Sequence, residues 1–298
     1  MDIILNSKKP EINIEYFGQQ SRFYSFFEKI VDDLLHGKGV YAETNSGSNV
    51  NAYMYAKKGY KVITNDVSEY SFSVANAIMS DSLPTSFSCK YEWLEQYSGT
   101  YIKRASVFAS IVDIYGYNAE IPSELDDKLK SKIEEYIKYF SSINEKNVRA
   151  YKSYNDDLFS YLKKLHEDNI KVDVMFMDFA WPWRDGSKTE EYNTTANIYS
   201  NVFEISKIKN IEIWDKSNVI DNVIKAVKEA KKVSKYVLLS NQSSNYPTPE
   251  LLEVALLKNN LNYEIRHTML TDAEYEDNLG KETFFREYLY VIRGDVND

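Results

Sequence analysis

The sequence predicts an α/β fold with a doubly wound, mostly parallel sheet, an antiparallel strand pair near the C-terminus and an inserted helical lobe. Short apolar runs rich in β-branched and aromatic residues alternate with amphipathic helical patterns over most of the chain. The interval between the second and third runs is far longer than one crossover helix needs. In such a fold, ligands bind at the carboxyl ends of the strands.

Six apolar runs predict buried strands, in chain order at residues 39–44, 61–66, 172–179, 235–241, 263–270 and 287–294. Helices are predicted where apolar residues recur every three to four positions, over 21–35, 124–140, 156–167, 218–233 and 249–258. A polar stretch without a helical pattern separates the last two strands, which therefore predict an antiparallel pair.

The long interval between the second and third predicted strands sets the predicted domain boundaries. Residues 1–75 and 170–298 are expected to form the sheet domain, and residues 76–169 the helical lobe. The 298 residues are 43% hydrophobic, which suffices for a packed core. No run of about 18 apolar residues and no signal peptide is found, so we expect a cytoplasmic protein without a membrane span.

The composition also limits the classes of function that the chain can have. The single Cys89 excludes an intrachain disulfide, and the three histidines lack ligand spacing, so no metal is expected. The net charge of -9 argues against non-specific attraction to nucleic acid. Charge can be segregated, however, and the Lys-rich segment 128–171 is either a solvated surface or a face that touches phosphate.

A small polar turn, residues 43–50, follows the first predicted strand and leads into a helix. Backbone N–H groups of such a turn approach a ligand closely, and the helix N-terminus adds partial positive charge. Glu43, Asn45 and Gly47 are its candidate cofactor-binding residues. With one glycine, the turn is also compatible with an ordinary Asn/Ser-rich loop.

Asp66 ends the second predicted strand, where an acidic residue can accept hydrogen bonds from the ribose hydroxyls of an adenosyl ligand. Its separation from Gly47 matches the spacing of about 20 residues that this role requires. A lone Asp at a strand end is also a common helix N-cap, so it is the pairing of turn and acid that favours a cofactor site.

The third predicted strand closes on Asp178, Phe179, Ala180 and Trp181, which leave the sheet at its carboxyl edge. This position favours a role in ligand binding or catalysis for Asp178 and Trp181. Trp183 follows two residues later and is more typical of a core residue.

Four blocks in this order resemble the Dam-type family of N6-adenine DNA methyltransferases: residues 16–20, 43–50, 59–66 and 178–181. The first resembles the family's aromatic–Gly–x–Lys block and adds Tyr16, Gly18 and Gln20 as candidate cofactor-binding residues. The last stands where the family has Asp-Pro-Pro-Tyr. Segments 238–240, 249–252 and 287–291 resemble its closing strands, and the helical interval takes the place of its target-recognition region.

The resemblance implies a class I methyltransferase fold, S-adenosyl-L-methionine as cofactor and double-stranded DNA as substrate. The target adenine would be flipped out of the duplex. Asp178 and the neighbouring backbone carbonyl would orient its amine, and Trp181 would stack on the base. Catalysis would come from positioning and electrostatics, with Phe179 and Ala180 shaping the turn.

The motifs also depart from the family pattern. Gln20 replaces Lys, Asn45 replaces a loop glycine, Glu43 stands at an aromatic position, and Phe179 and Ala180 replace both prolines. Two hypotheses therefore stay open. The chain is an active DNA adenine methyltransferase, or a degenerate subunit that binds DNA or an active methyltransferase partner. A homodimer is a further possible assembly.

Overall fold

The computed structural model describes residues 3–4, 23–80, 82–84, 89–116, 121–144, 152–186, 213–270 and 285–296. Its centre is an eight-stranded sheet in the order β1-β7-β8-β6-β5-β2-β3-β4. The strands are β1 (Ile3–Ile4), β2 (Val40–Glu43), β3 (Lys61–Asn65), β4 (Lys152–Tyr154), β5 (Val172–Met177), β6 (Ser234–Gln242), β7 (Tyr263–Leu270) and β8 (Phe285–Arg293).

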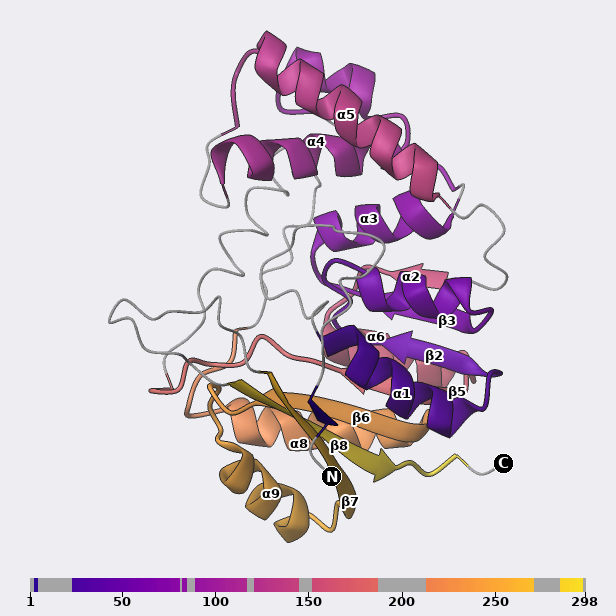
Figure 1. Ribbon diagram of the computed structural model, residues 1–298, viewed down its shortest axis with the longest axis vertical. Coiled ribbons are helices and arrows are strands. Elements are labelled where there is room, and N and C mark those ends of the chain that lie inside the picture. The colour runs from indigo at the N-terminus through magenta and orange to yellow at the C-terminus, as the bar shows by residue number, and fades with distance from the viewer. Residues whose placement is uncertain are drawn as a thin grey trace.

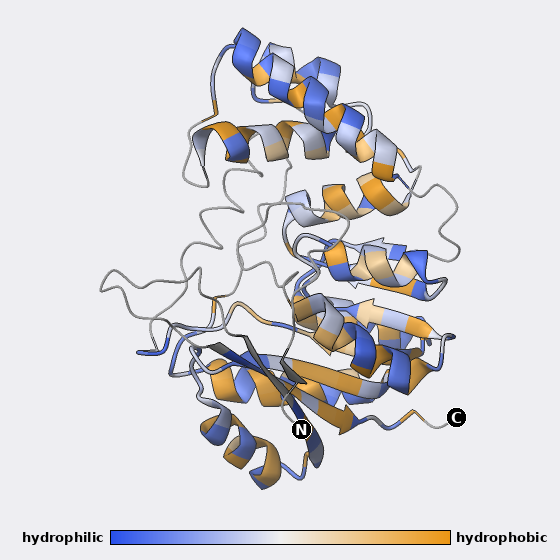
Figure 2. Ribbon diagram, viewed as in Figure 1, coloured by the Kyte–Doolittle hydropathy of each residue, from blue (hydrophilic) through white to orange (hydrophobic). Residues whose placement is uncertain are grey.

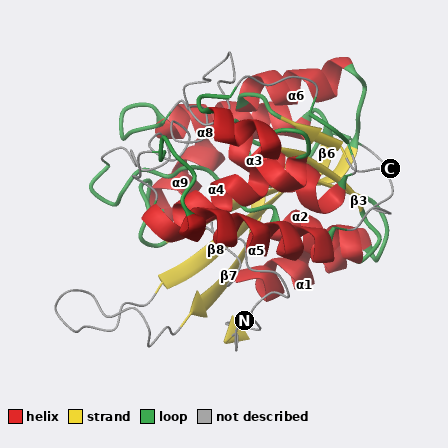
Figure 3. Cartoon of the chain, turned by 90° about the horizontal axis from the view of Figure 1, so that it is seen from above, coloured by secondary structure: helices red, strands yellow, loops and turns green. Residues whose placement is uncertain are grey.

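All neighbouring strands are parallel except β8, which runs antiparallel to both β6 and β7. The predicted Rossmann-like, mostly parallel sheet with an antiparallel C-terminal pair is therefore confirmed. In Figure 3, β7 and β8 extend side by side past the helices. From β2 the chain moves outward to β3 and β4, then returns to β5 on the other side of β2. This reversal creates a topological switch point between β2 and β5.

Helices cover both faces of the sheet (Figure 1). One face packs against α1 (Tyr24–Leu35), α2 (Val50–Lys57) and α3 (Glu69–Met79), and the other against α6 (Leu158–Glu167), α8 (Val219–Lys231) and α9 (Pro249–Lys258). Figure 2 shows apolar residues along the central strands, whereas the outer helices have mixed faces. Burial on both faces explains why the parallel strands are almost uninterrupted apolar runs.

The lobe predicted between the second and third strands contains the short 3-10 helix η2 (Glu92–Tyr97), α4 (Tyr101–Tyr115) and α5 (Asp127–Ile143). Figure 1 shows α4 and α5 stacked on α3, beyond the β3 side of the sheet. The last part of the same interval lies elsewhere, because β4 pairs with β3 and α6 packs against α8. The exact lobe boundaries at 76 and 169 stay a prediction.

None of the helices in the described ranges is long and apolar enough to cross a membrane.

Candidate functional site

Polar side chains stand in a row at the carboxyl edge of the sheet, around the switch point. Asp66 follows β3, Glu43 ends β2, Asp178 follows β5 and Ser240 lies near the end of β6. These four strands are neighbours in space, so residues far apart in the sequence meet at one edge. The edge thus collects the acids that the sequence analysis singled out.

The turn after β2 is held against the end of β3 by its own backbone. The Ser46 N–H donates to the Asn65 carbonyl over 2.9 Å, and the Gly47 N–H donates to Asp66 Oδ2 over 2.8 Å. Gly47 has a φ of 49°, a left-handed conformation that suits glycine. The predicted association of Gly47 with Asp66 is therefore a direct hydrogen bond.

Asp66 is buried, and both of its carboxylate oxygens accept backbone N–H groups, Oδ1 from Ser68 and Oδ2 from Gly47. Burial raises the pKa of Asp66, and these hydrogen bonds oppose the effect. The carboxylate thus fixes the turn in place. Its contact with a ribose stays a prediction.

Glu43 points into the interior, with 2% of its surface exposed, and accepts a hydrogen bond from the Tyr41 hydroxyl over 2.7 Å. Burial raises the pKa of Glu43 to about 8, and repulsion from Asp178 and Asp66 adds to this, while the Tyr41 hydrogen bond opposes it. Glu43 is therefore mostly a neutral acid at neutral pH, which limits the negative charge beside the turn.

Asp178 lies just beyond the end of β5 and is linked to β6 and β8. The Ser240 hydroxyl lies 3.4 Å from Asp178 Oδ1 and 2.5 Å from Oε1 of the fully buried Glu287. Burial raises the pKa of Asp178 to about 7, whereas hydrogen bonds from Trp181 and Ser240 oppose the rise. Asp178 is thus poised to gain or lose a proton near neutral pH.

The turn after β5, residues 178–183, carries aromatic side chains of which some are buried and one is exposed. The Phe179 ring packs edge-on against Trp181, with 5.4 Å between ring centroids, and at a tilt against Trp214, with 4.8 Å between centroids. Trp181 is only 6% exposed, whereas Trp183 is 49% exposed. The accessible aromatic side chain of this turn is therefore Trp183, and the prediction that Trp183 is a core residue is wrong. Stacking of Trp181 on a base stays a prediction.

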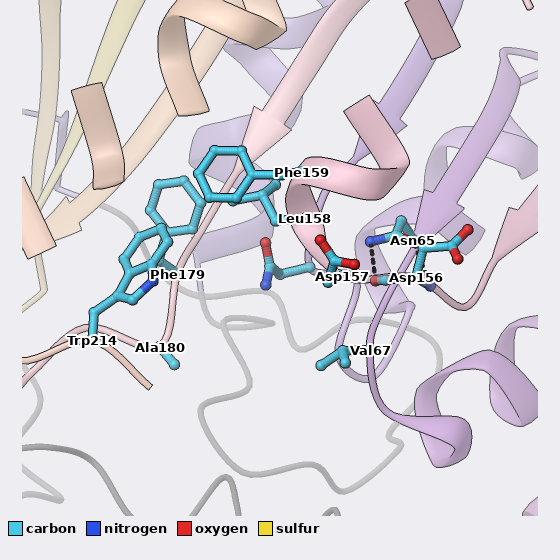
Figure 4. A pocket seen from close by; sticks show the side chains of 10 residues that line it. Asn65, Val67, Asp156, Asp157, Leu158, Phe159, Phe179, Ala180 and Trp214 are labelled. Carbon is cyan, nitrogen blue, oxygen red and sulfur yellow. Dashed lines mark hydrogen bonds between the residues drawn. The ribbon is translucent and has the colours of Figure 1, made fainter. Parts of the chain in front are cut away.

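A pocket of about 200 Å³ opens between the β5 turn and the ends of β2, β3 and β4 (Figure 4). Its walls combine aromatic and aliphatic side chains with amides and carboxylates. They comprise Asn45, Asn65, Val67, Asp156, Asp157, Leu158, Phe159, Phe179, Ala180 and Trp214. The predicted residues Asn45, Phe179 and Ala180 line it. Glu43, Gly47, Asp66, Asp178 and Trp181 are not among its lining residues.

One wall of the pocket is formed by the segment between β4 and α6, which the sequence analysis did not assign to the site. Asp157 caps α6, because its Oδ1 accepts the Ser160 N–H over 2.9 Å. The Asn65 amide donates to the Asp156 carbonyl over 3.1 Å, a bond drawn in Figure 4, and so ties this wall to β3. The two consecutive acids before an amphipathic helix are the signal that could have located this wall.

Tyr16, Gly18 and Gln20 lie outside the described residues, so their predicted cofactor contacts stay predictions. Within the described ranges no group of three or more His, Cys, Asp or Glu side chains is arranged to hold a metal ion.

Sequence comparison finds no matching family model and no matching curated protein. Solved structures with a similar backbone include a SAM-dependent methyltransferase from Agrobacterium tumefaciens (8% identity, 94% of this chain, 64% of that chain, TM-score 0.48). Another is precorrin 8W decarboxylase from Methanobacterium thermoautotrophicum (8% identity, 96% and 98%, TM-score 0.43). A third is an RNA methyltransferase candidate from Pyrococcus horikoshii (10% identity, 98% and 94%, TM-score 0.40). Similarities this distant do not indicate a shared reaction or substrate.

Proposed function

We propose that the chain is an S-adenosylmethionine-dependent methyltransferase that transfers a methyl group to N6 of an adenine flipped out of double-stranded DNA. The observation that supports this most directly is the pocket at the switch point. It is bounded by the turn after β2, the segment between β4 and α6, and the turn after β5. The hydrogen bond from the Gly47 N–H to Asp66 holds the first of these turns in place. Open α/β sheets bind nucleotide-like ligands at this place.

The pocket fits part of the cofactor. Its volume of about 200 Å³ is below the range of about 300–1,000 Å³ for complete small-molecule sites, so it suits a planar base better than a whole cofactor. Leu158, Phe159 and Phe179 provide apolar surface for the adenine ring of the cofactor. The carboxylates of Asp156 and Asp157 can accept hydrogen bonds from the exocyclic amine of that ring. Asn45, on the turn that Asp66 clamps, would then lie toward the ribose.

When bound, S-adenosylmethionine supplies an activated methyl group. We assign Asp178 its role because it directly precedes Phe179 and Ala180, which line the pocket, and because burial raises its pKa to about 7. As a carboxylate it accepts an N–H of the adenine amine and orients the nitrogen lone pair. On transfer of that methyl group to the adenine nitrogen, the Asp178 carboxylate would receive the proton that the nitrogen loses.

A second candidate function is a degenerate subunit that binds DNA or a partner methyltransferase without transferring methyl groups. The burial of Trp181 favours it, because a ring packed on Phe179 offers little surface to a flipped base. The two functions differ in one measurable property, since only the active enzyme methylates DNA by itself.

Isothermal titration calorimetry of the full chain with S-adenosylmethionine tests the cofactor site. The wild type is expected to bind with a Kd between about 1 µM and 1 mM, the range typical of enzyme ligands. Ala180→Phe should abolish binding by filling the pocket. Asp66→Asn should weaken binding by about 10- to 100-fold, because hydrogen bonds to a charged group contribute about 1.5–3 kcal/mol.

Asp168→Asn is the matched control, because Asp168 is an exposed acid at the end of α6 and should not affect binding. Absence of heat at millimolar ligand would refute the cofactor assignment. Binding without methyl transfer to duplex DNA would instead favour the degenerate subunit.

A further inference from the structure

Glu287 is an acid in the interior of the sheet to which the proposed function gives no role. It lies on β8, which is hydrogen-bonded to β6 on one side and to β7 on the other, and none of its surface is exposed. The next residues on the same face of β8, Leu289 and Val291, pack in the apolar core that α1 covers. A charged carboxyl is strongly destabilising in such a core, so an acid at this position requires a reason other than packing.

The strand register places Glu287 and Asp178 on either side of the Ser240 hydroxyl. β5 is paired with β6 as far as Met177, so Asp178 lies beside Ser240 just beyond the end of β5. Ser240 is paired with Leu289 of β8, which makes Glu287 its diagonal neighbour on the same face. The Ser240 Oγ lies 2.5 Å from Glu287 Oε1 and 3.4 Å from Asp178 Oδ1. We call these three side chains the Ser240 cluster.

Ser240 has one hydroxyl proton, so it can donate to only one of the two carboxyls at a time. If both acids were ionised, the proton would go to the nearer carboxylate, Glu287, and the lone pairs of the hydroxyl would face Asp178. The two negative charges would also repel each other. One proton held between the two acids removes both conflicts, because a neutral Glu287 donates to Ser240 and leaves the Ser240 proton for Asp178.

The surroundings of the two acids favour the proton on Glu287 and the charge on Asp178. Asp178 is partly exposed, and it accepts further hydrogen bonds from the Trp181 side chain and the Phe179 backbone. A carboxyl is more easily ionised where water and several donors reach it than where it is fully buried. We propose that Glu287 is a positioning residue, which holds the proton of the Ser240 cluster so that Ser240 donates to Asp178 and keeps it a carboxylate.

Acids on β2 and after β3 also lie near the cluster in the described part of the chain. Glu43 and Asp178 repel each other, and Asp66 repels Glu43. Glu43 is mostly neutral at neutral pH, so it adds little charge beside Asp178. The residues that β6 and β7 pair with Glu287 do not titrate; they are Gln242 and Thr268. The inference rests on the proposed role of Asp178 as the acceptor for the substrate amine, and it names the group that keeps this acceptor charged.

Urea unfolding of the full chain at pH 5 and pH 9 tests where the proton lies, independently of methyl transfer. A proton that Glu287 holds in the folded chain is released on unfolding above a pH of about 4.3, so the wild type loses stability relative to Glu287→Gln as the pH rises. The urea midpoint of Glu287→Gln, relative to that of the wild type, should therefore increase from pH 5 to pH 9 by on the order of 1 M. Glu264→Gln, at an exposed position on β7, is the control and should show no such increase. A Glu287→Gln difference that is equal at both pH values, or that decreases, would overturn the proposal.

The pH profile of methyl transfer tests the effect of Glu287 on Asp178. Glu287→Gln keeps a neutral donor beside Ser240 and should leave the midpoint of the profile within about 0.3 pH unit of the wild type. Glu287→Leu removes this donor, which weakens the Ser240 hydrogen bond to Asp178, and should move the midpoint by about 0.5–1 pH unit toward alkaline values. An ionised Glu287 predicts that both variants move the midpoint toward acid, and a merely structural role predicts a lower rate at every pH without a shift. Either of these results would refute the positioning role.

Failure of this inference and failure of the proposed function give different results. If the wild type does not methylate DNA but the unfolding difference increases with pH, the proposed function is wrong and the proton is on Glu287. If the wild type methylates DNA and the unfolding difference does not increase, this inference alone is wrong. Circular dichroism shows whether each variant is folded, and Glu287→Gln decides the question by both measurements even if Glu287→Leu does not fold.

Discussion

At pH 9, the Glu43→Gln variant is expected to be about 2–4 kcal/mol more stable than the wild type, whereas at pH 5 the two should be similarly stable. Burial raises the pKa of Glu43 to about 8 in the folded chain, compared with about 4.3 in an unfolded one. The folded state therefore binds a proton that the unfolded state releases. This contribution to stability is fully present below pH 4.3 and is lost as the pH rises through 8.

The size of the effect follows from the same pKa difference. One pKa unit corresponds to 1.36 kcal/mol, so the elevation sets an upper limit of about 5 kcal/mol, and relaxation around the charged group reduces it. Glutamine is uncharged and isosteric, and its oxygen still accepts the Tyr41 hydroxyl that bonds Glu43. Its amide can donate toward the acids that now repel Glu43.

Urea unfolding at pH 5, 7 and 9 measures this difference. Glu92→Gln, at an exposed position on η2, is the control and should follow the wild type at every pH. Tyr41→Phe removes the hydrogen bond that lowers the pKa of Glu43 and should steepen the loss of stability at high pH. A Glu43→Gln effect of equal size at pH 5 and pH 9 would show that the acid is not held neutral by the fold.

The sheet was predictable from the sequence because its strands are buried on both faces. β2, β3 and β5 each lie within a run that the apolar pattern located, and β6 extends one residue beyond its run at each end. The C-terminal pair was recognised by the polar stretch between its strands. Their carboxyl ends then fixed where Glu43, Asp66 and Asp178 would meet. Parallel strand topology alone thus positions acids that are more than 130 residues apart.

The helices that escaped prediction are those without a solvent face. In α4, every residue from Arg104 to Val112 is buried, so apolar and small polar residues follow one another without a helical period. Most of α3 is buried in the same way between α2 and α4. β4 has only three residues, too few to show a strand pattern.

The site was predicted in part for a related reason. A motif read along the chain locates the strand ends but not the direction in which each side chain points. Asp66 faces the backbone of the Gly47 turn rather than the pocket, and Trp181 packs inward while Trp183 faces solvent. The β4–α6 wall comes from a segment that has no motif, and tertiary packing brings it to the pocket.

Asp178→Asn is expected to lower methyl transfer to duplex DNA by about 100- to 1,000-fold, the usual effect of removing one transition-state hydrogen-bonding group. The physical reason is that asparagine cannot receive the proton that leaves the adenine amine. Because the pKa of Asp178 is raised to about 7, the wild-type rate should rise with pH through 7 and level off above it. Transfer of a radiolabelled methyl group to unmethylated DNA of mixed sequence measures both effects.

Ser240→Ala distinguishes the charge of Asp178 from a merely structural role. The Ser240 hydrogen bond lowers the pKa of Asp178, so its removal should shift the pH profile toward alkaline values and leave the plateau within about threefold of the wild type. Asp168→Asn is the control and should leave rate and profile unchanged. Because a damaged fold lowers the rate at every pH, only a carboxylate acting at Asp178 predicts a rate that recovers on raising the pH. An unshifted profile, or an Asp178→Asn variant within tenfold of the wild type, would contradict the role of this acid.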